Sequence, residues 1–159
     1  MPTLEFRYAT VEDAKLAAAL LRDIVAPFDI YNEEARSSEI AKFSATKIAT
    51  RIEADPKSVI LGYANGTPCG FSITQDQHGP IWLEWYGVTL LQRRQGIGEA
   101  IVRHLINEGP TRRATKIWCD THVSNISSMA LFQKLGFHRL CTLYNHWYGQ
   151  DFYLWERKI

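Results

Sequence analysis

The sequence has few of the features that would connect it to a membrane, to nucleic acid or to a secreted fold. Its longest stretch without charge, residues 58–75, is interrupted by glycines, asparagine and proline, so no segment offers the roughly 20 apolar residues that a spanning helix needs. The 18 lysines and arginines nearly balance the 17 aspartates and glutamates, which argues against a general electrostatic hold on nucleic acid or on an anionic membrane. Any partner must therefore be recognised by a local site.

Cysteines are also few. The three in the chain form no CxxC pair and leave one over, which is typical of reduced thiols in a cytoplasm and not of a disulfide framework. The N-terminal residues lack the apolar core of a secretory signal. We therefore expect a cytoplasmic protein.

Length and periodicity predict the fold class. The 159 residues, 46% of them apolar, are about one domain's worth, so we expect residues 1–159 to form a single domain. Strands are predicted at residues 4–8, 59–64, 69–74, 81–90, 116–123, 137–144 and 152–157. Helices are predicted from Thr10 toward Pro27, at 38–54, from Gly96 to the Gly109-Pro110 pair, and at 125–135. This order favours an α/β fold with a central mixed sheet of about seven strands, covered on both faces by about four helices. The step from Leu83 to Val123 should supply a parallel strand pair.

The segment Gln92–Gly98, QRRQGIG, lies between the end of an apolar strand and the start of an apolar-striped helix. Such a junction is suited to an anion, because free amides of the first helical turn and the helix dipole meet there, and glycines allow a phosphate to approach the backbone. An ordinary strand–helix turn with two exposed arginines is the alternative. A dinucleotide fingerprint would need a small residue where Ile101 stands, and a Walker loop would need Lys-Ser/Thr where residues 99–100 are Glu-Ala.

Two motifs carry a resemblance to a known family. Residues 93–98, RRQGIG, match the pattern Arg/Gln-x-x-Gly-x-Gly/Ala, and residues 125–137, NISSMALFQKLGF, are similar to Asn-x-x-Ala-x-x-Leu-Tyr-x-x-x-Gly-Phe. Together, in this order and separated by one strand, they resemble the GNAT family of acetyl-CoA-dependent N-acetyltransferases. The resemblance implies the GNAT fold and direct transfer of acetyl from acetyl-CoA to a primary amine, without a covalent enzyme intermediate. We expect no metal, because the histidines at 78, 104, 138 and 146 share no zinc-like spacing with cysteines or carboxylates.

The resemblance also implies which residues bind the cofactor. The backbone amides of Arg94 to Glu99 would hold the pyrophosphate, with Arg93 leading the motif, and the strand end at Tyr86 to Val88 would pair with the pantetheine arm and polarise the thioester carbonyl. Asn125 would contact that arm near its reactive end, although it is equally suited to cap a helix. The implied cofactor-binding residues are Tyr86, Gly87, Val88, Arg93, Arg94, Gln95, Gly96, Ile97, Gly98, Glu99, Asn125 and Phe132.

Two positions depart from the family pattern. Phe132 stands where many members have a tyrosine that can protonate the departing thiolate, and Ser128 replaces the usual alanine. Because a thiol with a pKa near 8.5 leaves tolerably as a thiolate, the loss should slow transfer without abolishing it. Phe132 would otherwise simply pack in the core. Tyr144 or a bound water is an alternative acid that no spacing supports.

Glu84 and Asp120 are the predicted catalytic residues, as candidates for the general base. Both lie on strands beside aromatic residues, where partial desolvation can raise a carboxyl pKa. Asp120 also has a position that resembles the catalytic carboxylate of some protein N-terminal acetyltransferases. Ordinary hydrogen-bonded or ion-paired strand carboxylates are the alternative for each. His122, two residues after Asp120, is a weaker third candidate.

The acceptor is open at this level. Six aromatic residues are candidates for the wall of a pocket that takes an apolar or cationic amine, although strand aromatics are more often plain core. They are Trp82, Trp85, Tyr86, Tyr144, Trp147 and Tyr148. We expect a small-molecule or peptide amine as the partner of a monomer or homodimer, with no nucleic acid and no membrane. Because a catalytic tyrosine is missing, a non-catalytic acyl-CoA-binding or sensing module is the alternative function.

Overall fold

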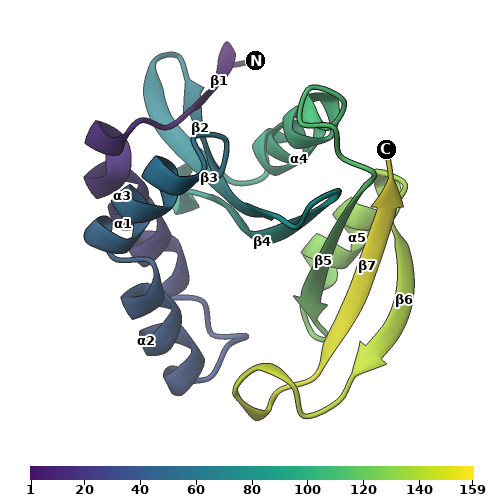
Figure 1. Ribbon diagram of the computed structural model, residues 1–159. Helices are drawn as coiled ribbons and strands as arrows, with labels where there is room; N and C mark the ends of the chain where they lie inside the picture. Colours follow the sequence, from purple (N-terminus) through teal and green to yellow (C-terminus); the bar gives the residue numbers. More distant parts are fainter.

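The computed structural model describes all 159 residues as a seven-stranded sheet with helices on both sides (Figure 1). The strands are β1 (Leu4–Tyr8), β2 (Val59–Ala64), β3 (Thr67–Asp76), β4 (Pro80–Val88), β5 (Lys116–His122), β6 (His138–Leu143) and β7 (Phe152–Lys158). The helices are α1 (Ala14–Val25), α2 (Glu33–Lys42), α3 (Ala45–Ala54), α4 (Ile97–Glu108) and α5 (Ile126–Lys134). Single 3-10 turns lie at Val11–Asp13, Leu90–Gln92 and Trp147–Gly149. The predicted mixed sheet is confirmed, with the order β1-β2-β3-β4-β5-β7-β6.

Each face of the sheet buries a separate apolar cluster. On one face α1 and α3 pack on β2 and β3, with Leu21, Ile48 and Phe71 fully buried. On the other face α4 and α5 cover β4, β5 and β7, and the cluster there includes Leu105 and Trp155. Figure 1 shows α1, α2 and α3 on one side of the sheet, well apart from α4 and α5. The coverage of both faces is therefore as predicted.

The predicted helix at 38–54 is wrong as a single element. Two helices, α2 and α3, replace it, because Phe43 leaves helical geometry and Ser44 begins a new helix by accepting a hydrogen bond from the amide of Lys47. Asn32 caps α2 in the same way through the amide of Ala35. The strand predicted to reach Leu90 ends at Val88, and Leu90 begins a 3-10 turn.

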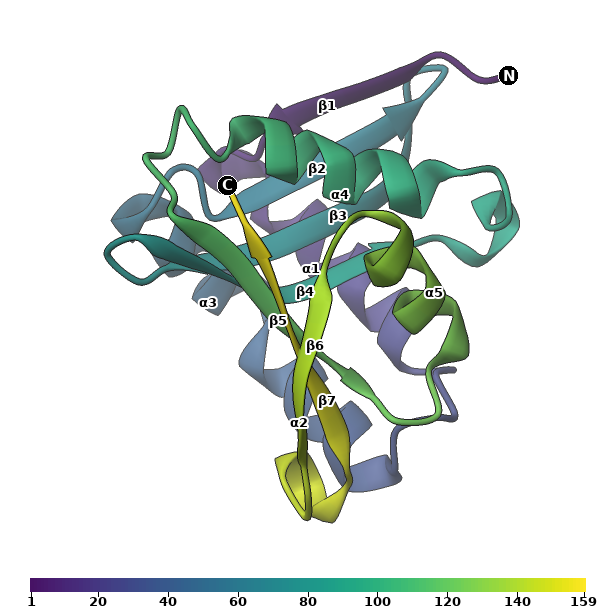
Figure 2. The ribbon, with the colours of Figure 1, turned by 90° about the vertical axis from the view of Figure 1, so that its right-hand side faces the viewer.

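The parallel pair of β4 and β5 is short. Only Pro80 to Leu83 pair with Lys116 to Cys119, although both strands continue beyond these residues. β5 then remains paired with β7 alone, while β4 remains paired with β3. The two strands separate as they run on (Figure 2), so the β5-facing edge of β4 from Glu84 to Val88 lacks a strand partner. The sheet thus opens where the functional motifs lie.

None of the helices is both long and apolar enough to cross a lipid bilayer.

Candidate active site

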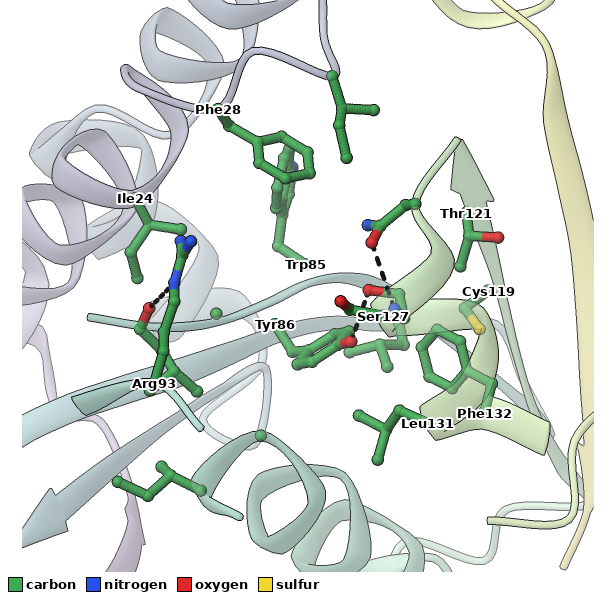
Figure 3. Close-up of a pocket in the computed structure, with 18 of the residues that line it drawn as sticks. Ile24, Phe28, Trp85, Tyr86, Arg93, Cys119, Thr121, Ser127, Leu131 and Phe132 are labelled. Atoms are coloured by element: carbon green, nitrogen blue, oxygen red, sulfur yellow. Dashed lines mark hydrogen bonds between the residues drawn. The ribbon is translucent and has the colours of Figure 1, made fainter. Parts of the chain in front are cut away.

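A cavity of about 510 Å³ occupies the opening between β4 and β5. Its walls come from the end of α1 and the loop after it, from Leu83 to Val88 of β4, from the loop before α4, from the end of β5 and from the start of α5. Figure 3 shows side chains from these separate segments pointing into one space. Ten of the twelve predicted cofactor-binding residues line it, which are Tyr86, Gly87, Val88, Arg93, Arg94, Gly96, Ile97, Gly98, Asn125 and Phe132.

The loop before α4 contains two residues with left-handed backbone geometry. Gly96, the N-cap of α4, has φ +76°, and Arg94 has φ +64°. Two left-handed residues so close together curl the chain and bring successive amides to the helix start, which is the geometry of an anion-binding concavity. Arg93 folds back and donates from Nε to the carbonyl of Val88 at 3.2 Å (Figure 3). This bond ties the loop to the free end of β4.

Gln95 and Glu99 do not line the cavity. Gln95 is exposed, and the Glu99 carboxylate binds Lys134 at 2.6 Å and Arg103 at 2.8 Å. These two cations lower the pKa of Glu99. At these two positions only the backbone amides remain available for the predicted role.

Asn125 caps α5. Its Oδ1 atom accepts a hydrogen bond from the amide of Ser128 at 3.2 Å, and its side chain also lines the cavity. The capping alternative is therefore confirmed, while the Nδ2 group is the end of the side chain left for a ligand.

A second cavity of about 530 Å³ adjoins the first. Tyr31, Glu84, Trp85 and Asp120 line both cavities. The remaining wall of the second cavity comes from α2, β3, β4, β5 and the hairpin between β6 and β7, and includes Trp82, Trp118, Trp147 and Tyr148. The predicted aromatic wall is thus present in part. Tyr86 faces the first cavity, and Tyr144, which is 77% exposed, lines neither.

Asp120 lies at the junction of the two cavities, just beyond the last β5 residue that pairs with β4. Burial away from water raises its pKa to about 6, although Trp147 Nε1 donates to its Oδ2 atom at 2.5 Å. A carboxyl with that pKa is mostly ionised at pH 7 and is basic enough to take a proton from an amine. Asp120 therefore combines position and basicity.

Glu84 differs from Asp120 in its partners. Its carboxylate binds Arg51 at 2.7 Å and Lys42 at 3.2 Å, with only 7% of the side chain exposed. Two cations on its oxygens hold Glu84 as a structural anion between β4 and helices α2 and α3. His122 is similarly engaged, since its Nδ1 accepts from the amide of Ser124 and its Nε2 meets Gln150. Burial lowers the pKa of His122.

Phe132 is 1% exposed and packs edge-on against Tyr86, with ring centres 5.6 Å apart, and against Phe137 at 4.9 Å. The interpretation of Phe132 as a core residue is confirmed. Its neighbour Tyr86 has a hydroxyl that meets the Ser128 hydroxyl at 2.7 Å.

Several site residues carry no signal in the sequence. Tyr31 lies in the loop between α1 and α2, and Glu39 on α2 accepts hydrogen bonds from Trp85 Nε1 at 2.8 Å and Tyr148 OH at 2.9 Å. Both line the second cavity. Neither belongs to a motif, because their place depends on how α2 packs against β4 and the β6–β7 hairpin.

The chain also matches known proteins. The model of the acetyltransferase (GNAT) family matches residues 19–137, which is most of the chain and includes both motifs. The [ribosomal protein bS18]-alanine N-acetyltransferase of Escherichia coli K12 is 33% identical over 87 residues, covering 55% of this chain and 59% of that protein. The chain thus matches a little over half the length of this relative.

Two solved structures share the fold over nearly the whole chain. The PaiA N-acetyltransferase of Thermoplasma acidophilum, in complex with coenzyme A, has a TM-score of 0.80 at 20% identity and covers 99% of both chains. A GNAT-family acetyltransferase from Streptococcus pneumoniae has a TM-score of 0.83 at 18% identity and also covers 99% of both chains.

Proposed function

The chain belongs to the GNAT acetyltransferase family, and from this premise we propose that it is an acetyl-CoA-dependent N-acetyltransferase that acts on the α-amine of a protein or peptide. The observation that carries the proposal is the pair of adjoining cavities that share Asp120. The first cavity has the anion-binding loop and all of the free edge of β4, whereas the second has no part of that loop and only Glu84 and Trp85 of that edge. Such an arrangement suits a reaction between two substrates.

The first cavity suits acetyl-CoA. The amides at the start of α4 face it and would bind the pyrophosphate, with Arg93 and Arg94 on the same wall. The unpaired edge of β4 offers backbone groups to the amides of the pantetheine arm and to the thioester carbonyl. The structure of the Thermoplasma acidophilum enzyme contains coenzyme A, which supports this cofactor.

The second cavity suits the acceptor. Its aromatic residues offer an apolar surface, and the carboxylates of Glu39 and Asp120 favour a cationic amine. An amine that enters here reaches Asp120 at the boundary with the first cavity. Asp120 would take the proton from the attacking nitrogen, while backbone donors of β4 stabilise the charge that develops on the thioester oxygen.

An α-amine is favoured over a lysine side chain. An α-amine with a pKa near 7.8 is neutral in about one molecule in ten at pH 7, and a lysine amine in only about one in a thousand, whereas Asp120 with a pKa of about 6 is a moderate base. The Escherichia coli relative is named for an alanine of ribosomal protein bS18, which supports a protein N-terminus as acceptor. Such a substrate would place the enzyme in the cytoplasm.

Calorimetry and a free-thiol assay test the proposal. Acetyl-CoA and coenzyme A are titrated into the protein, and thiol release is then followed with an alanine-initiated peptide, the same peptide with a blocked N-terminus and an internal lysine, and a polyamine. We expect binding of both cofactors and release only with the free α-amine. Thiol release with the polyamine alone would indicate a small-molecule acceptor and not a peptide. Cofactor binding without thiol release for any amine would instead fit an acyl-CoA-binding module.

A further inference from the structure

Aminolysis of a thioester expels a thiolate, and the first cavity contains one side-chain pair suited to receive it. Tyr86 on β4 and Ser128 on α5 both line this cavity, and their hydroxyl oxygens lie 2.7 Å apart. This bond links β4 to α5. Ser128 and the neighbouring Phe132 are the two positions at which the second motif departs from its family pattern.

We propose that the Tyr86 hydroxyl, oriented by Ser128, donates a hydrogen bond to the sulfur of coenzyme A as it leaves. The inference rests on the proposed acetyltransferase function and names a further catalytic residue for it. Tyr86 would touch the reacting sulfur, and Ser128 would act through Tyr86 as a positioning residue.

The surroundings of Tyr86 favour this role over that of a plain core tyrosine. Its ring packs edge-on against Phe132, which holds the ring in place, while its hydroxyl remains at the cavity wall (Figure 3). A largely buried tyrosine hydroxyl needs a hydrogen-bond partner in any case, but here both the hydroxyl and its partner belong to residues that line the cavity. Here the hydroxyl has Ser128 as its partner, and Ser128 can rotate to donate to the Tyr86 oxygen when Tyr86 donates to sulfur. Two such bonds in series strengthen each other.

The magnitudes indicate that the proton stays on Tyr86. Burial raises the pKa of Tyr86 to about 12, whereas a thiol has a pKa near 8.5, so the phenol stabilises the thiolate and does not lose its proton to it. The balanced step follows. The amine nitrogen forms a bond to the carbonyl carbon, the C–S bond breaks with its electron pair on sulfur, and the nitrogen loses a proton to Asp120. The thiolate then takes a proton from solvent, and Asp120 returns one.

The direct test measures the thiol pKa of bound coenzyme A by its thiolate absorbance in the ultraviolet. A hydrogen bond to the thiolate lowers this pKa, so we expect Tyr86→Phe to raise it by about one unit or more. Ser128→Ala should raise it by less, and Ser128→Thr, which retains the hydroxyl, should leave it unchanged. This readout requires cofactor binding but no turnover, so it remains informative even if the acceptor is different or the protein only binds acyl-CoA.

Kinetics give the second readout. We expect Tyr86→Phe to lower kcat about ten- to a hundredfold, as for a lost hydrogen bond to a charged group, with the KM for acetyl-CoA changed by less than about threefold. Tyr8→Phe is the matched control, because its hydroxyl donates to Glu108 at 2.6 Å and lies outside both cavities. A bound-thiol pKa that is the same in wild type and Tyr86→Phe would overturn the proposal. An unchanged pKa in Ser128→Ala would remove the positioning role.

Discussion

Burial of Asp120 has consequences for catalysis and for stability. Its pKa of about 6 lies well above the value of 3.8 for an ordinary aspartate, and the free energy for this difference comes from the folded state. Between about pH 4 and pH 6 the unfolded chain loses the Asp120 proton while the folded chain retains it. Stability therefore falls as pH rises through this window, and the full penalty is present above pH 6.

We predict that Asp120→Asn makes the protein more stable and much less active. A shift from 3.8 to about 6 corresponds to about 3 kcal/mol, and partial exposure of the side chain reduces the expected gain at pH 7 to about 1–2 kcal/mol. Denaturant unfolding at pH 7 and pH 4 measures the free energy of unfolding of variant and wild type. The gain in stability of the variant should vanish at pH 4. Asp23→Asn, at an exposed position of α1, is the control. A variant less stable than wild type at pH 7 would contradict the burial argument.

The same residue should shape the pH profile. For an α-amine acceptor, both the amine and Asp120 must be deprotonated, so the slope of log kcat/KM against pH should change from about two to about one as pH rises through 6. Asp120→Asn should lower kcat by about a hundredfold or more and retain a slope of about one throughout. A profile that is parallel in wild type and variant would exclude Asp120 as the base.

A substitution at Gly98, in the first turn of α4, tests the proposed cofactor site. A Cβ built on Gly98 meets only Tyr86 and Val88, both at 3.6 Å, so the helix itself tolerates a side chain there, while a large one would fill the cavity. We expect Gly98→Trp to weaken acetyl-CoA binding by about a hundredfold or more in calorimetry, because the indole occupies the pyrophosphate approach. Asn107→Trp, at an exposed position of the same helix, should bind normally. Equal affinities in the two folded variants would place the cofactor elsewhere.

At the scale of elements, the loop after α1 and the hairpin between β6 and β7 meet over the junction of the cavities. Gln150 accepts from the amide of Asn32 at 3.0 Å and donates to the carbonyl of Ile30 at 3.2 Å. The side-chain Nδ2 of Asn32 donates to the carbonyl of Tyr148 at 3.0 Å. These bonds join two segments far apart in the sequence and hold the aromatic wall of the second cavity.

Loss of this link should affect the acceptor more than the cofactor. We predict that Gln150→Ala raises the KM for the acceptor peptide about fivefold or more, because two backbone groups of the loop after α1 lose their side-chain partner and the wall loosens. The dissociation constant for acetyl-CoA should change by less than about twofold. Gln133→Ala, exposed on α5, provides the comparison. An unchanged KM for the acceptor would mean that the hairpin does not shape its site.

Elements with strong periodicity could be predicted from the sequence, and those held by caps could not. The bounds of the strand at Leu4–Tyr8 agree with the sequence prediction. Apolar and charged residues alternate along it, and in the structure half-buried and exposed residues alternate in the same way. The helix α2 was missed at its start because only Ala35 on it is buried, so no apolar stripe marks it. Its start is set by the cap at Asn32 and its end by the break before Ser44. Hydrophobic periodicity does not reveal either feature.

At the scale of the molecule, the candidate site is where two parts of the chain meet. The loop before α4 and the start of α5 could be located from the sequence, because each is a local motif at the start of a helix. The partners of Asp120 and Glu84 could not, because Trp147 and Arg51 lie far from them in sequence. Only tertiary contacts therefore distinguish two carboxylates that look equivalent in the sequence. These contacts leave Asp120 without a cationic partner and pair Glu84 with Arg51.

The short ladder between β4 and β5 leaves backbone groups without a protein partner. Only four residues of each strand pair, so under the proposed function coenzyme A would bond the free edge of β4 and the loop before α4 in place of water. We predict that coenzyme A slows amide hydrogen exchange at residues 84–88 and 94–99 by about tenfold or more. The edge strand β1, which lies outside both cavities, should be unaffected. Gly98→Trp should show no such protection at the same coenzyme A concentration. Equal protection in this variant, or protection confined to the second cavity, would contradict the assignment of the first cavity to the cofactor.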